Sequence, residues 1–108
     1  MVSQNVYIPD LGSFAAVPEA GILSRTVVDT ESARVVYFAF AEGELLSEHT
    51  AAMPAILHIL DGEAHLTLGN ESYDAGAGAW AYMPANLPHS IQARTPLIML
   101  LTLLKKGS

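Results

Sequence analysis

The chain has 108 residues, of which 51% are hydrophobic and 15% are charged, and its formal net charge is −6. A single domain of this length buries roughly 60–70% of its unfolded surface, so we expect a hydrophobic core and not a disordered chain. Only five residues are basic. Nucleic acids and anionic membranes require a basic patch, so neither is an expected partner.

Cysteine is absent, which excludes disulfides, thiolate metal ligands and a cysteine nucleophile. The first residues, MVSQNVYIPDLG, lack the basic and apolar regions of a signal peptide. The longest apolar run, at 97–104, is far shorter than the ~20 residues of a membrane-spanning helix. We therefore expect a cytoplasmic protein with one domain over residues 1–108, in which residues 1–20 form a short strand and an irregular arm.

Short apolar runs bounded by Gly, Pro, Asn or Asp follow one another along the chain, which is the pattern of an all-β protein. The expected strands cover residues 6–8, 22–28, 35–41, 55–60, 64–68, 72–73, 79–83, 90–94 and 97–104, and a further one precedes His49. The Asp61-Gly62 dipeptide predicts a hairpin between 55–60 and 64–68. About nine or ten strands at this spacing indicate a sandwich or barrel, and two similar strand–turn–histidine units suit a jelly roll.

Two of these strands, 35–40 and 97–104, are apolar at both alternating positions. A half-exposed antiparallel strand alternates, so the second face of each must be covered. A second sheet, the N-terminal segment or another subunit would each provide cover. We expect a homodimer, because two-fold interfaces are the commonest among soluble oligomers.

Histidine is the commonest metal ligand, and the chain has four of them. Only His49 and His89 lie at strand ends beside turns, where barrels open. His58 lies inside an apolar strand, which indicates a partly buried side chain. His65 alternates with an apolar face and is expected on the solvated surface.

Two spaced motifs contain the two strand-end histidines. The first consists of Gly43, five residues, His49-Thr50-Ala51, three residues, Ala55, six residues and Gly62. The second consists of Gly78, five residues, Pro84-Ala85-Asn86, two residues, His89, three residues and Ala93. This spacing resembles that of the cupin superfamily, in particular small single-domain cupins of the conserved-barrel type. The resemblance implies a jelly-roll β-barrel with His49 and His89 pointing into its mouth.

The metal site of the family that the chain resembles uses three histidines and one glutamate, or a fourth histidine. Here Ala51 and Ala55 stand at two of these four positions. Catalytic zinc sites usually have three protein ligands, and the non-haem iron triad includes a carboxylate. We therefore expect His49 and His89 to form a two-histidine site that binds a divalent transition metal, Zn, Ni, Mn or Fe, weakly.

Because two of the four metal ligands are replaced by alanine, we favour a barrel that binds a small molecule. The ligand would be apolar or aromatic and would lie near the two histidines. The resemblance also leaves open a metal-dependent enzyme of the dioxygenase or isomerase type, and a regulatory sensor. No residue is identified as catalytic, so whether the protein is an enzyme stays open. The strand at 79–83 has Trp80 and Tyr82 on one face and Ala79, Ala81 and Met83 on the other, and the sequence does not decide which lines the interior.

Overall fold

The structure, a computed structural model, describes residues 5–105 and consists almost entirely of β-strands. The elements are η1 (Leu11–Ser13), a 3-10 helix, and the strands β1 (Ile22–Asp29), β2 (Ala33–Phe40), β3 (Leu45–His49), β4 (Ala55–Asp61), β5 (Ala64–Leu68), β6 (Glu71–Ala75), β7 (Trp80–Met83), β8 (His89–Ala93) and β9 (Leu97–Leu104). From β1 onward, each strand for which the sequence predicted bounds begins and ends within two residues of the prediction.

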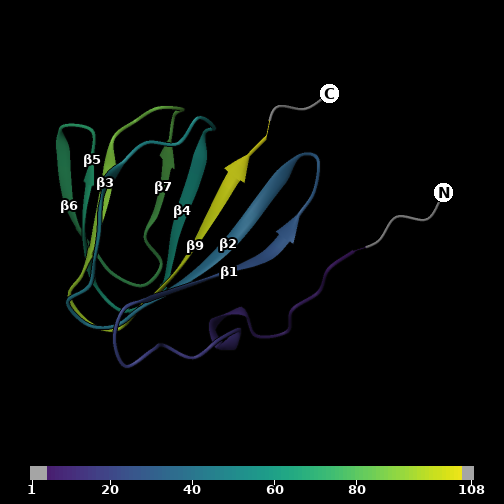
Figure 1. Cartoon of the computed structure of the whole chain (residues 1–108), viewed down its shortest axis with the longest axis horizontal. Coiled ribbons are helices and arrows are strands. Elements are labelled where there is room, and N and C mark those ends of the chain that lie inside the picture. The colour runs from purple at the N-terminus through teal and green to yellow at the C-terminus, as the bar shows by residue number, and fades with distance from the viewer. Residues whose placement is uncertain (1–4, 106–108) are drawn as a thin grey trace.

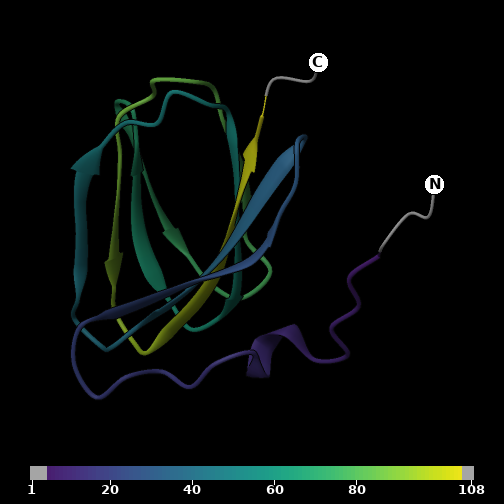
Figure 2. The same ribbon diagram turned by 45° about the vertical axis from the view of Figure 1, so that its right-hand side comes forward.

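The strands form two antiparallel sheets that face each other (Figure 1). One sheet has five strands in the order β1-β2-β9-β4-β7, and the other has four in the order β3-β8-β5-β6. The chain crosses repeatedly between the sheets, and turning the molecule shows the two layers around a common interior (Figure 2). This arrangement is a jelly roll, and the predicted all-β jelly-roll fold is confirmed.

The interior is filled by alternate side chains of both sheets. Leu57, Ile59 and Met99 of the five-stranded sheet meet Leu66 and Ile91 of the four-stranded sheet, and all five are at most 3% exposed. Each fully buried side chain of this size stabilises the fold by roughly 1.5–3 kcal/mol relative to an exposed one. The same alternation turns the neighbouring residues outward, which fixes the face on which every candidate site residue lies.

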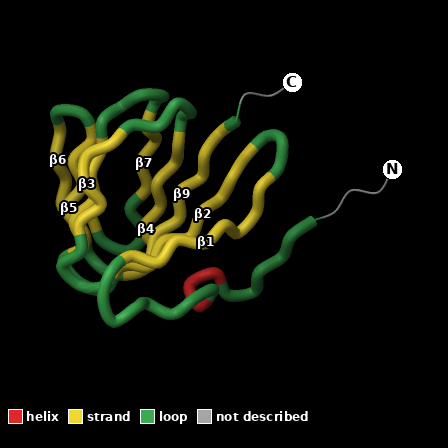
Figure 3. The backbone as a smooth tube through the Cα atoms, viewed as in Figure 1, coloured by secondary structure: helices red, strands yellow, loops and turns green. Residues whose placement is uncertain are grey.

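The outer face of the five-stranded sheet is partly covered by the N-terminal segment. Residues 11–17 pack over Tyr37, Ala39 and Ile98, and the Phe14 ring lies against the Tyr37 ring with centroids 5.3 Å apart. Figure 3 shows this segment running beneath β1 and β2. The N-terminal segment therefore covers the outer apolar face of strand 35–40, which is one of the three possibilities raised by the sequence.

The rest of that outer face has no covering element among residues 5–105. Strand register places one set of outward side chains side by side on β9, β4 and β7. We call this set the outer patch: Ile56, His58, Trp80, Tyr82, Thr102 and Leu104. Trp80 and Tyr82 are 60% and 52% exposed. None of the six residues is an aspartate, glutamate, lysine or arginine.

The predicted hairpin at Asp61-Gly62 is wrong. β4 pairs with β7 and β9, whereas β5 pairs with β6 and β8, so this turn carries the chain from one sheet to the other. Gly62 has a φ of 91°, and a Cβ there would lie 2.1 Å from the Pro96 carbonyl oxygen. The glycine is thus required by a close approach of the 95–97 backbone, a constraint that a dipeptide signal does not distinguish from a hairpin.

The strand predicted over residues 6–8 is also wrong. These residues belong to no strand, and Val6 and Tyr7 are 60% and 79% exposed. A run of three residues is too short to bury an apolar face without a sheet edge beside it. Within residues 5–105, the structure contains no helix long and apolar enough to cross a membrane.

Candidate functional site

His49 and His89 lie directly opposite each other in the β3–β8 ladder, and their ring centroids are 4.1 Å apart at an interplanar angle of 60°. His89 is 4% exposed and shares the inner face of β8 with Ile91, whereas His49 is exposed at the end of β3. The ladder is irregular between Leu46 and His49. Because Leu46 packs against the core, this extra residue is what turns His49 to the same inner face as His89.

Both imidazoles are held by the same kind of hydrogen bond. The Nδ1 atom of His49 lies 2.8 Å from the Ser47 carbonyl oxygen, and that of His89 lies 2.9 Å from the Leu87 carbonyl oxygen. A carbonyl oxygen only accepts, so each Nδ1 carries the proton and donates it. In the neutral ring the Nε2 lone pair is then free. The backbone thus fixes the tautomer and the orientation that histidine ligands adopt in metal sites.

The other two histidines lie on outer faces. His58 belongs to the outer patch of β4, and His65 pairs with Asp74 on the outer face of the four-stranded sheet. His65 Nδ1 and an Arg94 guanidinium nitrogen each lie 3.0 Å from one Asp74 carboxylate oxygen. The hydrogen bond from His65, reinforced by the Arg94 charge, holds the pKa of the Asp74 carboxyl below its usual value. His65 lies on the outer face, as predicted. Its side chain is partly covered by this ionic cluster and is therefore not fully solvated.

The turn before β8 brings the second motif against the first. Asn86 has a φ of 67°, a left-handed conformation that asparagine tolerates better than most residues. Its backbone N–H donates to the Ala51 carbonyl oxygen at 2.7 Å. The loop after His49 and the turn before His89 are therefore joined, which supports the placement of both histidines.

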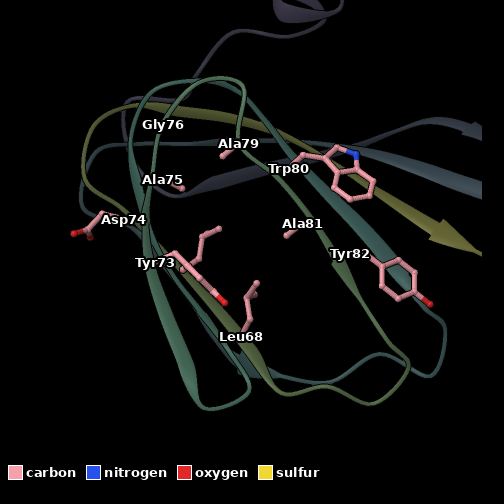
Figure 4. A pocket seen from close by; sticks show the side chains of 10 residues that line it. Leu68, Tyr73, Asp74, Ala75, Gly76, Ala79, Trp80, Ala81 and Tyr82 are labelled. Atoms are coloured by element: carbon pink, nitrogen blue, oxygen red, sulfur yellow. The ribbon is translucent and has the colours of Figure 1, made fainter.

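The structure decides which face of β7 lines the interior. Met83 is 2% exposed, and Ala79 and Ala81 pack against the core. In Figure 4 these two alanines point toward Leu68 and Tyr73, whereas Trp80 and Tyr82 point away on the other side of the strand. The inner face of β7 thus offers only methyl groups and one methionine.

Comparison with known families identifies the fold. The Cupin domain family matches residues 36–103, more than half of the chain and including both histidines. The chain belongs to the cupin family. No curated protein matches it.

Solved structures match over most of the chain. A conserved protein of unknown function from Streptococcus pyogenes is 27% identical with a TM-score of 0.85, and the match covers 98% of this chain and 93% of that one. A cupin superfamily protein from Desulfitobacterium hafniense is 26% identical with a TM-score of 0.81, covering 97% and 95%. A cupin 2 conserved barrel domain protein from Leptotrichia buccalis is 30% identical with a TM-score of 0.80, covering 87% of this cupin and 46% of that chain.

The residues of this cupin do not fit a four-ligand metal centre. Ala55 is 3% exposed and faces the interior beside Met83, so the inward position on β4 carries a methyl group in place of a donor. Ala51 likewise has no donor side chain. Within residues 5–105, no three histidine, cysteine, aspartate or glutamate side chains are grouped so that they could hold a metal ion. Two imidazole nitrogens remain available.

Two inward-facing polar residues were not singled out in the sequence. Glu71 pairs with Leu68, which pairs with His89, so residue 71 is exposed on the same row two strands, or ~10 Å, from His89. Tyr73 lies on the next inner row, opposite Leu66. The available signal was the alternation of Ser72 and Asp74 with Tyr73 and Ala75. It was missed because only 72–73 were recognised as a strand.

Proposed function

We propose that this cupin binds a small organic molecule at the barrel mouth and that His49 and His89 are its contact residues. The observation that supports this proposal is the shared arrangement of the two rings, each with Nδ1 bonded to a backbone carbonyl oxygen, which makes Nε2 the acceptor of the neutral ring. Two acceptor nitrogens from rings only 4.1 Å apart can receive a hydrogen bond from one ligand group or coordinate one cation together.

The same pair would hold a divalent transition metal weakly, with solvent or the ligand in the remaining coordination positions. Two protein ligands are fewer than the three of a usual catalytic zinc site. This favours a binding protein over a metal-dependent enzyme of the dioxygenase or isomerase type, the alternative that the fold alone would equally permit. Stoichiometric metal retained through chelation would favour the enzyme.

Calorimetric titration of the tag-free protein with Ni²⁺ and Zn²⁺ tests the proposed site. We expect one ion per chain with a dissociation constant above about 1 μM, and loss of binding in both His49→Ala and His89→Ala. His65→Ala is the matched control. His65 lies on the outer face, so this substitution should leave the titration unchanged. Nanomolar affinity, or binding that survives both substitutions, would contradict the two-histidine site.

We further propose a homodimer formed through the outer patch. The patch carries no aspartate, glutamate, lysine or arginine on a chain with a net charge of −6, so it is where two copies can meet without repulsion between carboxylates. Its exposed Trp80 and Tyr82 are residue types enriched at protein interfaces. The N-terminal segment covers only the neighbouring part of the sheet. A second copy of the chain would therefore cover the outer patch.

A further inference from the structure

A cavity of about 570 Å³ lies between β6 and β7, the last strands of their respective sheets. Its lining includes Leu66, Leu68, Ala79 and Ala81 from the interior, Tyr73 from β6, and Trp80 and Tyr82 at the edge of β7. Small-molecule sites in proteins have volumes of roughly 300–1,000 Å³ and mostly apolar walls. The cavity exists because the two facing sheet edges are not hydrogen-bonded to each other and the inward side chains of β7 are too small to fill the space.

The lining determines the chemistry of a ligand. Its interior wall is aliphatic, Trp80 and Tyr82 add aromatic rings at the edge of β7, and the Tyr73 side chain extends from β6 into the same space (Figure 4), where its phenol supplies a polar group. No lysine or arginine lines the cavity, and the only ionisable carboxylate at its border, Asp74, points away toward its ionic partners. An anion would gain no partner here and would be repelled by a chain of net charge −6.

The cavity ends one strand away from the histidine pair. Leu68, which lines it, lies directly opposite His89 in the β5–β8 ladder, and both residues face the interior. Cα atoms of such partners are about 4.5–5.5 Å apart. A molecule bound between β6 and β7 would therefore have its inner end beside Leu68, the residue next to His89.

We infer that the space between β6 and β7 is a binding site for an uncharged aromatic molecule of one or two rings that bears a hydroxyl or amine group. The rings occupy the space above Ala79 and Ala81, and the polar group bonds to the Tyr73 hydroxyl. This inference rests on the proposed small-molecule function and names the ligand class, but the cavity and the metal-binding nitrogens are separable by mutation.

The chain offers its own reporter, since Trp80 on β7 is its single tryptophan. Titration with N-phenyl-1-naphthylamine, an uncharged apolar fluorophore, should give saturable fluorescence with one probe per chain and energy transfer from Trp80. Ala81→Phe fills the cavity and should weaken probe binding at least tenfold. Ala79→Leu is a second filling variant for the case that Ala81→Phe does not fold, which thermal unfolding will show.

Ile56→Ala, in the outer patch on the outward face of β4 and not among the residues that line the cavity, is the matched control. It should leave probe affinity unchanged, whereas a loss in this variant with full binding in Ala81→Phe would place the probe on the outer patch and overturn the inference. Displacement of the probe should be stronger with 2-naphthol than with naphthalene, and Tyr73→Phe should abolish the difference. An undiminished difference would overturn the role of the hydroxyl.

His49→Ala and His89→Ala separate this inference from the proposed metal-binding function. Both variants should lose Ni²⁺ binding while they keep the fluorescent probe. If the wild type binds Ni²⁺ but not the probe, the cavity inference fails and the histidine site stands. If it binds the probe but not Ni²⁺, the proposed coordination fails and the cavity site stands.

Discussion

The hydroxyl oxygen of Tyr37 on β2 lies 2.8 Å from the carbonyl oxygen of Ala15 in the N-terminal segment. The Tyr37 ring is fully buried, and a second carbonyl, that of Gly12, lies 3.2 Å from the same hydroxyl. One side chain of the sheet thus satisfies the backbone of a segment that forms no strand. This contact explains how residues 11–17 cover the outer face without a β-ladder.

Tyr37→Phe should therefore lower the free energy of unfolding by about 0.5–1.5 kcal/mol, because it removes the single hydroxyl proton that the Ala15 and Gly12 carbonyl oxygens share. Urea unfolding measures the loss. Hydrogen exchange of the 11–17 amides should accelerate, while the amides of β4 and β9 stay protected. Unchanged exchange in the segment would show that packing of Phe14, and not the hydroxyl, holds it.

The outer patch predicts different outcomes for two neighbouring residues of β4. Ile56 points outward and is half-buried, whereas Leu57 points inward and is fully buried. At micromolar concentration the wild type should sediment at twice the 11.5 kDa chain mass. Ile56→Asp should give a folded monomer with dimer affinity lowered ~100-fold or more, because an unpaired charge would be buried at the interface. Leu57→Asp should unfold the domain. A wild-type monomer, or a dimeric Ile56→Asp, would contradict the interface.

The lowered pKa of Asp74 predicts a pH dependence of stability. A carboxyl whose pKa is lower in the folded state contributes stability above its unfolded pKa of about 3.9, and the contribution disappears as pH falls through the folded value. Asp74→Asn should thus lower the urea midpoint at neutral pH, and the difference from the wild type should shrink below about pH 4. In an Arg94→Gln background the effect should be smaller, since one partner is gone. A difference that grows toward low pH would have the wrong sign.

Strand positions in this cupin could be predicted from the sequence, because turn residues punctuate short apolar runs throughout. Sheet membership could not. The Asp61-Gly62 turn has the local chemistry of a hairpin, but the approach of the Pro96 backbone, more than thirty residues later, decides that the chain crosses to the other sheet. Local signals fix where a strand ends and leave its partner to tertiary packing.

The histidine pair could be located from motif spacing, but the direction of each ring could not. His49 faces the interior only because of the irregularity in β3, and simple alternation from Leu46 would have turned it outward. Similarly, the sequence of 79–83 did not show which face of this strand lines the interior. One face is aliphatic and the other is aromatic, and aromatic side chains occur both in cores and at exposed interfaces. Burial of Met83 decides it.

Restoring donors at the two alanine positions should convert the weak site into a strong one. Ala51→His combined with Ala55→Glu adds two ligands where the family spacing has them, and Ni²⁺ affinity should rise ~100-fold or more. The metal-free double variant should be less stable than the wild type, because Ala55 is buried and a glutamate there is unpaired without the ion. Calorimetry and thermal unfolding with and without Ni²⁺ measure both effects. No gain in affinity would mean that residues 51 and 55 do not face the two histidines.

The most direct test of the histidine site is a long-range ¹H–¹⁵N correlation spectrum of ¹⁵N-labelled protein at about pH 8, where free imidazoles are neutral. The structure predicts that His49 and His89 are both Nδ1–H tautomers in the metal-free protein, since each Nδ1 donates to a backbone carbonyl. Adding Zn²⁺ should shift the Nε2 resonances of these two rings and leave those of His58 and His65 in place. An Nε2–H tautomer at either residue, or shifts confined to His58 or His65, would contradict a shared site at the barrel mouth.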